Sequence, residues 1–435
     1  MNEVMIGIAG LLLLVGLALT GMELGIAMAV VGFLGFGYIR DFDAAYGVAS
    51  SDFFETFSSY GLTVIPLFIL MGQIAFNAGI ARKLYGMAHR FVGHVPGGLG
   101  IATVVGATIF KAVCGSGPAT VATFASVAVP EMEHYKYSKV LSTGTVATVG
   151  TLGCLIPPSV FLIIFGLITQ QSIGQLFLAG LFPGLILALF FVCIILGWAR
   201  INPSIGPKGE RYSWSDRLRS LPEVIGPLII FIVVIGGLMS GFFTPTEAGS
   251  VGTFAVLLLV LIKRDLALKG YIRAVAESLR TACMVLLLIA GSTVMGHFLA
   301  VTKIPMMAAD WISGLPLNRY LVMILIILIF EAGGSFIDDL AFIVLATPIF
   351  YPAVIKLGFD PIWFGIVMGI TLGIGGIIPP VAMNVFVVKN ITKVPFNTIY
   401  KGVYPFLIAM LVCLALLFAF PEIALWLPRA YGVGK

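Results

Sequence analysis

Residues 150–159 read Gly-Thr-Leu-Gly-Cys-Leu-Ile-Pro-Pro-Ser, and residues 371–380 read Thr-Leu-Gly-Ile-Gly-Gly-Ile-Ile-Pro-Pro. Both stretches interrupt long apolar segments with glycines and a Pro-Pro pair. Each proline lacks a backbone N–H and leaves a carbonyl of the preceding turn without its donor. Non-helical backbone at membrane depth is tolerated only where protein buries it or where it lines a watery cavity. We therefore interpret both stretches as functional breaks in membrane helices, with simple kinking as the alternative.

The composition places most of the chain in a lipid bilayer. Of its 435 residues, 60% are hydrophobic and only 10% are charged, and the mean hydropathy is +1.09. A water-soluble domain carries roughly a quarter charged residues, so most of this chain has no polar face for water. The net charge of +5 comes from basic residues between apolar runs, which argues against nucleic acid as a partner. The five cysteines are widely spaced in apolar segments and predict neither disulfides nor a metal site.

Apolar stretches long enough to cross a hydrocarbon core of about 30 Å lie in both halves of the chain. In the first half they are residues 4–20, 23–39, 61–79, 138–168 and 172–199. In the second half they are residues 221–241, 246–262, 282–300, 360–389 and 402–425. Residues 97–133 and 317–354 are too long for one span and too short for two, and each has a glycine-rich break. We predict two re-entrant helical hairpins there, with pairs of short tilted helices as the alternative.

Sequence landmarks recur at an offset of about 220 residues, which indicates a tandem duplication. The pairs are Thr20, Glu23 and Gly25 with Thr244, Glu247 and Gly249, Gly72 with Gly291, Gly115 and Ser116 with Gly334 and Ser335, Pro157 and Pro158 with Pro379 and Pro380, and Gly180 and Pro183 with Gly402 and Pro405. The repeats are predicted at 1–200 and 221–435, with a cytoplasmic linker at 201–220. Each half contains five spans and one hairpin, and a hairpin does not cross the membrane. Each half therefore crosses an odd number of times, so the second half must have the opposite orientation. The predicted fold is therefore an all-α polytopic membrane protein of two inverted-topology repeats, each with a hairpin and a broken helix.

Basic residues predict the sidedness, because short cytoplasmic loops are richer in Lys and Arg than external loops. Basic residues flank the first hairpin and recur in the linker. They are Arg82, Lys83, Arg90, Lys136, Lys139, Arg200, Lys208, Arg211, Arg217 and Arg219. The loop 263–280 is also basic, whereas 41–58 is acidic. Both termini are therefore predicted to be periplasmic. Segments 44–58, 80–95, 265–280 and 303–314 are predicted to lie along the membrane interface as arms that brace the hairpins.

The breaks and the hairpin tips are the candidate binding sites. An interrupted helix presents free N–H groups at one end of the break, which suit an anion, and free carbonyls at the other, which suit sodium. The tips at 114–120 and 333–339 would each face one Pro-Pro break. Four hydroxyls would add oxygen ligands, with hydrogen bonding to their own preceding turn as the alternative. They belong to Ser116, Thr120, Thr151 and Ser335.

Four charged residues lie inside the apolar hairpins, where an ionised side chain costs roughly 2.5 to 3.5 kcal/mol on insertion scales. We expect Asp338 or Asp339 to neutralise a bound sodium ion, although Asp339 is equally read as a helix cap facing water. Lys111 is expected either to pair with Glu331 across the hairpins or to contact an anionic substrate.

The run Gly150 to Ser159 resembles the large membrane subunit of TRAP transporters, the tripartite ATP-independent periplasmic importers of the DctM type. The resemblance covers essentially the whole chain and rests also on residues 115–120, 130–132, 244–248 and 336–338, and on Ile378-Pro379-Pro380 followed by Asn384. It implies an elevator-type, sodium-driven importer in the bacterial inner membrane. It also implies an organic anion as substrate, usually a carboxylate. The implied partners are a periplasmic binding protein and a small four-helix membrane subunit, with Na⁺ as coupling ion and no other cofactor.

Carried over by position, the resemblance implies two sodium sites and a substrate site. The first sodium site would use Gly115, Ser116, Gly117, Thr120, Thr148 and Thr151. The second would use Gly334, Ser335, Asp338, Asp339, Thr371, Gly375 and Gly376. Substrate contacts would come from Lys111, Pro157, Pro158, Ser159, Pro379, Pro380 and Asn384. Lys111, Cys114 and Asp339 depart from the residues expected at their positions, so the resemblance leaves substrate and ion stoichiometry open.

Two other classes of protein remain as alternatives. A stand-alone sodium and carboxylate symporter of the same architecture would need no partner subunits. A membrane enzyme is disfavoured, because the sequence shows no His, Cys or carboxylate cluster at ligand spacing. No P-loop pattern occurs either, so ATP is not the expected energy source.

Overall fold

The computed structural model describes residues 3–431, and in this range every regular element is a helix. The first half of the chain contains α1 Glu3–Leu19, α2 Leu24–Ile39, α3 Phe42–Ser58, η1 Gly61–Thr63, α4 Val64–Asn77, α5 Ile80–Val92, α6 Gly98–Lys111, α7 Gly117–His134, α8 Lys139–Val149, η2 Gly150–Cys154, α9 Val160–Thr169 and α10 Ile173–Ile201. The linker contains α11 Trp214–Ser220. The second half contains α12 Pro222–Met239, α13 Pro245–Lys263, α14 Leu268–Thr302, α15 Ile304–Ser313, α16 Arg319–Phe336, α17 Asp339–Lys356, α18 Pro361–Gly375, α19 Met383–Thr392, α20 Phe396–Ala419 and α21 Glu422–Tyr431.

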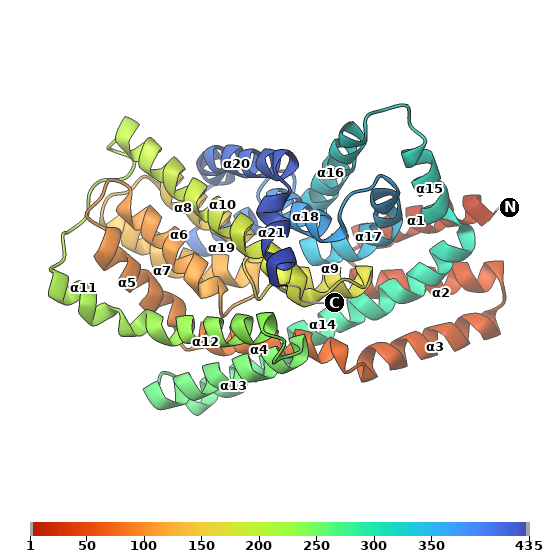
Figure 1. Ribbon diagram of the computed structural model, residues 1–435, viewed down its shortest axis with the longest axis horizontal. Helices are drawn as coiled ribbons and strands as arrows, with labels where there is room; N and C mark the ends of the chain where they lie inside the picture. The colour runs from red at the N-terminus through yellow and green to blue at the C-terminus, as the bar shows by residue number, and fades with distance from the viewer. Residues whose placement is uncertain (1–2, 432–435) are drawn as a thin grey trace.

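Several of these helices can cross a membrane. Seven helices within the described residues are long and apolar enough, or eight if the bent pair Phe42–Ser58 and Gly61–Asn77 is one span. Figure 1 shows an elongated bundle with α6 and α7 toward one end and α16 and α17 toward the other. Each of these pairs occupies a segment for which the sequence predicts a hairpin, and its two helices contact each other.

The sequence prediction differs from the structure at residues 265–300. The predicted arm at 265–280 and the predicted span at 282–300 form one continuous helix, α14. No proline lies within that helix, so nothing removes its backbone hydrogen bonds. In the first half, α3 and the segment Gly61–Asn77 meet at a bend of 56°, close to Pro66. The last predicted span, 402–425, instead begins at Phe396 and ends at Ala419, just before Pro421.

Left-handed backbone positions recur between the halves. In each half, residues with positive φ end helices or link them, and a residue in the first half has a counterpart about 220 residues later in the second half. The pairs are Gly21 with Gly241, Gly79 with Lys303, Lys136 with Gly358, and Gln170 with Lys393. This recurrence supports the duplication that the sequence predicts.

The two halves are interlocked through their early helices. Helix α2 packs against α14 and helix α4 against α13, so each pair takes one member from each half. At the first crossing, a Cβ on Gly291 would lie 2.0 Å from the Gly25 carbonyl oxygen. At the second, Thr253 Oγ1 donates to the Leu67 carbonyl at 2.8 Å. Small residues that allow such close backbone approach are typical of helix pairs in membranes.

The short helix α5 holds the base of the first hairpin. His89 is buried and its ring packs edge-on against Tyr135 and Tyr212, with centroids 5.4 and 5.6 Å apart. Its Nδ1 lies 3.9 Å from a Glu131 carboxylate oxygen on α7. Burial lowers the pKa of the His89 imidazole, and the Glu131 carboxylate opposes that shift. The arm, the hairpin and the linker therefore meet at one aromatic cluster.

The short helix α15 has the same role at the second hairpin. Asp310 of α15 forms an ion pair with Lys356 at the end of α17. The Arg319 guanidinium lies over the rings of Tyr320 and Phe359, at 5.0 and 5.4 Å from their centroids. The two hairpins are therefore each anchored at the base by an arm from their own half.

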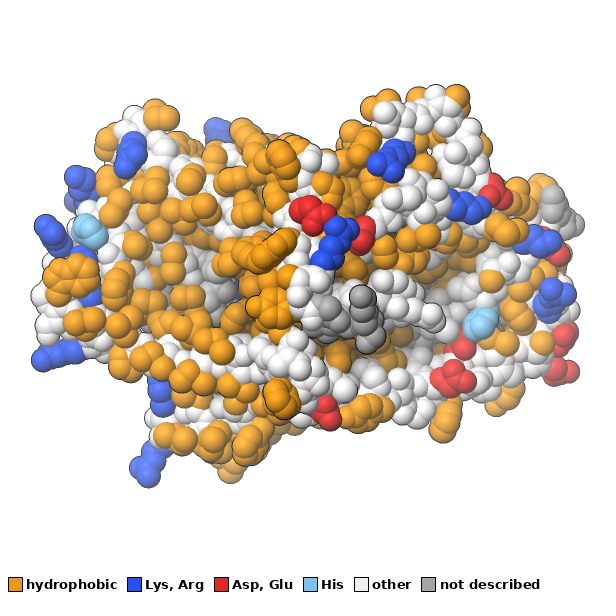
Figure 2. All heavy atoms as spheres, viewed as in Figure 1, with side chains coloured by type: hydrophobic (Ala, Val, Ile, Leu, Met, Phe, Trp, Pro, Cys, Tyr) orange, Lys and Arg blue, Asp and Glu red, His pale blue; other side chains and the backbone are white. Residues whose placement is uncertain are grey.

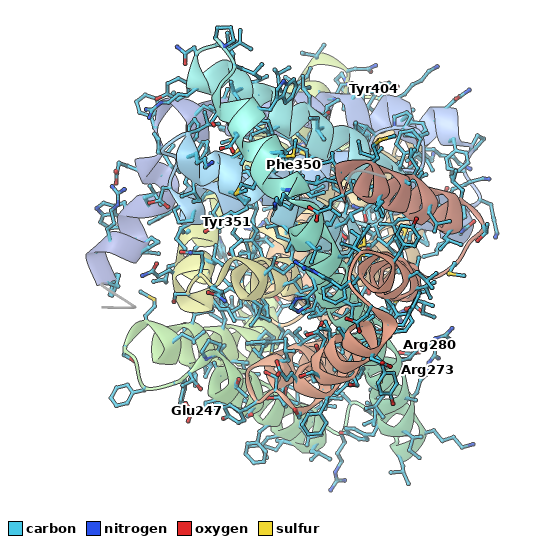
Figure 3. The ribbon with its side chains drawn as sticks, turned by 90° about the vertical axis from the view of Figure 1, so that its right-hand side faces the viewer. Glu247, Arg273, Arg280, Phe350, Tyr351 and Tyr404 are labelled. Atoms are coloured by element: carbon cyan, nitrogen blue, oxygen red, sulfur yellow. The ribbon has the colours of Figure 1, made fainter. Side chains whose placement is uncertain are left out.

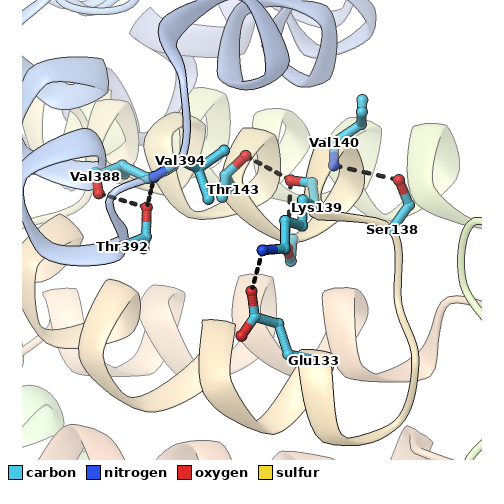
Figure 4. Close-up of polar contacts among 9 residues, drawn as sticks. Glu133, Ser138, Lys139, Val140, Thr143, Val388, Thr392 and Val394 are labelled. Atoms are coloured by element: carbon cyan, nitrogen blue, oxygen red, sulfur yellow. Dashed lines mark hydrogen bonds and ion pairs between the residues drawn. The ribbon is translucent and has the colours of Figure 1, made fainter.

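The turn from α7 into α8 is fixed by polar contacts (Figure 4). Lys139 Nζ lies 3.5 Å from a Glu133 carboxylate oxygen, and the Ser138 hydroxyl accepts from the Val140 N–H at 3.3 Å. Asp360 caps α18 at the matching place, accepting from two backbone N–H groups of the first turn. Such caps satisfy helix donors that would otherwise be unpaired.

The molecular surface is largely apolar. Figure 2 shows hydrophobic side chains over most of the visible face, with Lys and Arg gathered at the end that holds α5 and α11. Figure 3 shows Arg273 and Arg280 projecting outward from the first half of α14. An apolar belt with charges toward its ends is what a bilayer requires of a spanning protein.

We expect Gly291→Ala to destabilise the protein. The new methyl would collide with the Gly25 carbonyl, which is backbone and cannot turn aside. Overpacking of this kind typically costs about 1–3 kcal/mol. A thermal unfolding midpoint in detergent, followed by size-exclusion chromatography, measures the effect.

Gly296→Ala is the matched control, because it lies on the same helix with no atom within 4 Å of its Cβ position. This control should keep or slightly raise the midpoint. Equal midpoints for the two variants would contradict the close crossing of α2 and α14.

Candidate functional site

Both hairpin tips present the start of a helix. Between α6 and α7 the chain is non-helical, and the Ser116 side chain caps α7 by accepting from the Ala119 N–H at 3.4 Å. Asp338 caps α17 in the same way, accepting from the Leu340 N–H at 3.2 Å. Each tip therefore carries the positive end of a helix dipole.

The first tip lies directly against the first broken helix. Helix α8 continues into the short 3-10 helix η2, and residues 155–159 are non-helical before α9 begins. A Cβ on Gly115 would lie 2.8 Å from the Pro158 carbonyl oxygen, and one on Gly117 would lie 3.2 Å from the Gly150 carbonyl oxygen. Only residues without side chains allow this approach of backbone to backbone.

The second tip meets the second broken helix in the same manner. Helix α18 ends at Gly375, and α19 begins only at Met383. A Cβ on Gly375 would lie 2.7 Å from the Gly334 carbonyl carbon. The Val381 N–H donates to the Ser335 carbonyl at 3.1 Å. The Pro157–Pro158 and Pro379–Pro380 peptide bonds are both cis.

The two breaks and the two tips meet at one place. A Cβ on Gly373 would lie 3.2 Å from the Thr151 Cβ, so the broken helices touch. The Asn384 amide nitrogen lies beside Gly150 of the first break, at 2.9 Å from its Cβ position. The Cys154 thiol of the first break donates to Asp339 of the second tip at 3.4 Å. The two predicted pairs of tip and break are thus adjacent.

Two cavities lie at this junction. The larger, about 290 Å³, has one wall from the two tips and the first break, and an opposite wall from α4 and α14. Its polar lining includes Ser116, Asp338, Asp339, Gln73 and Thr281. The smaller, about 20 Å³, lies between the tips and the two breaks and is lined by Thr151, Gly376 and Asn384 among others. A cavity of the larger size accommodates a small organic molecule.

The structure brings most of the predicted ion-site residues to these cavities. Gly115, Ser116, Gly117, Thr151, Gly334, Asp338, Asp339 and Gly376 line at least one of them. Thr120, Thr148, Ser335, Thr371 and Gly375 are buried directly behind that lining. The assignment of these residues to two sodium ions stays a prediction.

Five of the site hydroxyls follow the alternative left open by the sequence, because each donates to a carbonyl of its own preceding turn, whereas the Ser116 hydroxyl accepts from the Ala119 N–H. The donor and acceptor pairs are Thr120 with Ser116 at 2.9 Å, Thr148 with Gly144 at 2.8 Å, Thr151 with Thr148 at 2.7 Å, Ser335 with Ala332 at 2.7 Å and Thr371 with Val367 at 2.9 Å. A hydroxyl that donates its proton keeps two lone pairs, so its oxygen remains a ligand for a cation.

The residues predicted to bind substrate fall into different places. Asn384 lines the smaller cavity. Pro157, Pro158 and Ser159 are buried behind the first tip, and Ser159 caps α9. Pro379 and Pro380 are exposed and line neither cavity. Direct substrate contact through the prolines is therefore not part of this conformation.

Lys111 is completely buried at the end of α6. Its Nζ donates to the Ser116 carbonyl at 2.7 Å. The hypothesis of a pair with Glu331 is wrong for this conformation, because Lys111 takes part in none of the ion pairs found among residues 3–431. Its ammonium instead forms a hydrogen bond within the first hairpin tip.

Sequence reasoning missed the wall of the larger cavity formed by α4 and α14. Gln73 and Thr281 are its polar members, and Phe68 and Met284 are among its apolar ones. Gln73 is an amide near the middle of a largely apolar span, which is a usable signal. The sequence does not show which distant helix faces the tips, because that depends on packing.

The chain matches known proteins along nearly its whole length. Residues 11–423 match the family "Tripartite ATP-independent periplasmic transporter, DctM component". The C4-dicarboxylate TRAP transporter large permease protein DctM of Pseudomonas aeruginosa is 35% identical, covering 87% of this chain and 89% of that protein. The sialic acid TRAP transporter large permease protein SiaM of Vibrio cholerae is 32% identical, covering 97% and 98%. The Alcanivorax borkumensis YdaH transporter structure aligns with a TM-score of 0.63 over 91% of this chain and 90% of that chain, at 11% identity, so that likeness concerns the fold alone.

The apolar helices and the two broken helices around a shared cavity define a multi-pass membrane protein of the transporter class. The chain belongs to the DctM family, the large permease subunits of TRAP transporters. The resemblance read from the sequence is therefore confirmed. Its relatives are named as permeases, in agreement with the expectation that the chain is not an enzyme.

We expect Gly115→Ala to impair transport while leaving the protein folded. The methyl would lie 2.8 Å from the Pro158 carbonyl and would push the first tip off the break. Displacement of a binding site by about 1 Å can reduce rates by about a hundredfold. Initial uptake by proteoliposomes that contain the reconstituted transporter, normalised to the amount of protein, measures the loss.

Gly86→Ala on α5 is the control, since no atom lies within 4 Å of its Cβ position. It should transport like the unmodified protein. Normal uptake by Gly115→Ala would show that the contact between tip and break is not needed for transport.

Proposed function

We propose that this large permease subunit is a sodium-coupled secondary transporter that imports an organic anion, most simply a carboxylate, by an elevator mechanism. The observation that carries the proposal is the convergence of both tips and both breaks on two adjoining cavities, the larger of which is also lined by α4 and α14. The carboxylate class is supported by relatives named for C4-dicarboxylates and sialic acid, since both substrates carry carboxylates.

The chemistry of the junction suits an anion together with a cation. The N-terminal turns of α7 and α17 offer backbone N–H groups to a carboxylate. The breaks leave carbonyl oxygens without helical donors, and half-helix ends of this kind coordinate sodium in secondary transporters. Asp338 supplies the negative charge that a bound sodium ion needs.

In this proposal, the hairpins and the broken helices move as one block. Within the block, α7 contacts α19 and α17 contacts α9, so each hairpin holds the broken helix of the other half. The scaffold would be formed by α2, α14, α4 and α13, because α14 contacts both α2 and α4, and α4 contacts α13. The packing adds α10 and α20 to the moving block, because they contact the broken helices α18 and α8.

The proposed topology follows the sequence. Two inverted repeats, at 1–200 and 221–435, would place the basic linker in the cytoplasm and both termini in the periplasm of the bacterial inner membrane. The gathering of Lys and Arg at the end with α5 and α11 supports this sidedness (Figure 2). Family membership favours work with a small membrane subunit and a periplasmic binding protein over a stand-alone symporter.

Sodium dependence tests the proposal. With the three components reconstituted, replacing sodium by choline should abolish uptake, and Asp338→Asn should raise the sodium concentration for half-maximal uptake by about tenfold or more, because a buried charge partner is lost. Uptake is measured as a function of sodium at fixed membrane potential.

Asp43→Asn is the control, because Asp43 is exposed on α3 and remote from both cavities. Its sodium dependence should match the unmodified protein. Undiminished uptake in choline without a proton gradient would overturn sodium coupling.

A further inference from the structure

Lys111 places a positive charge inside the first hairpin tip. The side chain is completely buried, and its ammonium donates to the Ser116 carbonyl at 2.7 Å. The same carbonyl also accepts from the Thr120 hydroxyl at 2.9 Å and from the Thr120 N–H at 3.3 Å. This oxygen is one of those expected to bind sodium, and three donors already surround it.

The first break has space for this ammonium only because residue 153 is glycine. A Cβ on Gly153 would lie 2.2 Å from Lys111 Nζ and 3.3 Å from the Gly117 N–H nitrogen. The ammonium therefore lies between the first tip, whose Ser116 carbonyl it contacts, and Gly153 of the first break. A sodium ion that joined the tip to the broken helix would occupy the same place.

A carboxylate from the second half lies close to this position. Cys154, next to Gly153, donates to the Asp339 carboxylate at 3.4 Å. The first tip therefore has a cation, a carbonyl ligand and a nearby carboxylate without any bound ion.

Resting on the proposed function above, we propose that the Lys111 ammonium takes the place of one sodium ion at the first tip. An ammonium and a sodium ion carry the same charge and both bind carbonyl oxygens, so the two exclude each other there. Reversible sodium binding then occurs only at the second tip, beside Asp338. Removing the ammonium while keeping the carbonyls would open a second sodium site.

Direct counting of bound sodium tests this inference, with ²²Na⁺ as the probe and the purified chain in complex with its small subunit. Lys111→Met and Lys111→Ala should each bind one more sodium ion per chain than the unmodified protein. Lys111→Arg, which keeps the charge, should bind the same number as the unmodified protein. Lys269→Met, at an exposed lysine of α14, is the matched control and should also bind that number.

Two neutral variants are used so that the test still works if one of them misfolds. Each variant must elute as a monodisperse peak in size-exclusion chromatography before its bound sodium is counted. Equal sodium counts in the unmodified protein and both neutral variants would overturn the inference while leaving sodium coupling intact. A gain of sodium by Lys111→Arg would also overturn it, because charge would then not be the cause. Absence of bound sodium in every variant would instead overturn the proposed sodium coupling, and this inference with it.

Discussion

Backbone contact between each hairpin tip and a broken helix is the constraint on which the rest of the structure depends. Gly115 touches the Pro158 carbonyl, and Gly375 touches Gly334. Groups released from helical hydrogen bonding inside a membrane must be buried in protein or face a cavity. The tip of each half covers the break of that half, and the other half adds to this cover, because α7 packs on α19 and α17 packs on α9. The interlocked arrangement of the halves follows from the need to cover both breaks.

The same constraint explains why the two breaks differ in environment although their sequences match. Pro157 and Pro158 are buried, whereas Pro379 and Pro380 are exposed, and Phe336 at the second tip is 65% exposed. In the proposed scheme of inverted repeats and alternating access, the two repeats would occupy unlike environments in any single conformation. The observed asymmetry fits one side of such a proposed cycle.

The sequence predicts local features well where glycine and proline determine the backbone. The breaks near Pro157 and Pro379 and the hairpin segments follow from chemistry that acts within a few residues. The continuity of α14 was not predicted, because charged residues such as Arg273 and Arg280 suggest an interfacial arm when read apart from the helix that carries them.

Features that depend on packing across the molecule could not be predicted. Lys111 had two plausible partners in the sequence, a carboxylate and a substrate, but the structure gives it a carbonyl five residues away. Gln73 joins the cavity wall only because α4 packs beside α14 opposite the tips.

A fixed ammonium and an exchangeable sodium ion have different consequences for transport. In the proposed scheme, either cation would bind the Ser116 carbonyl oxygen and hold the tip against the break, so either would help to form the binding cavity. Only an ion that leaves and returns can link its gradient to substrate movement, because coupling between two ligands is a reciprocal change in their binding free energies. The desolvation cost of the Lys111 charge is met once, during folding, and is not repeated in each cycle. The first tip would therefore contribute to affinity, and the driving force would come from the second tip, where Asp338 faces the cavity.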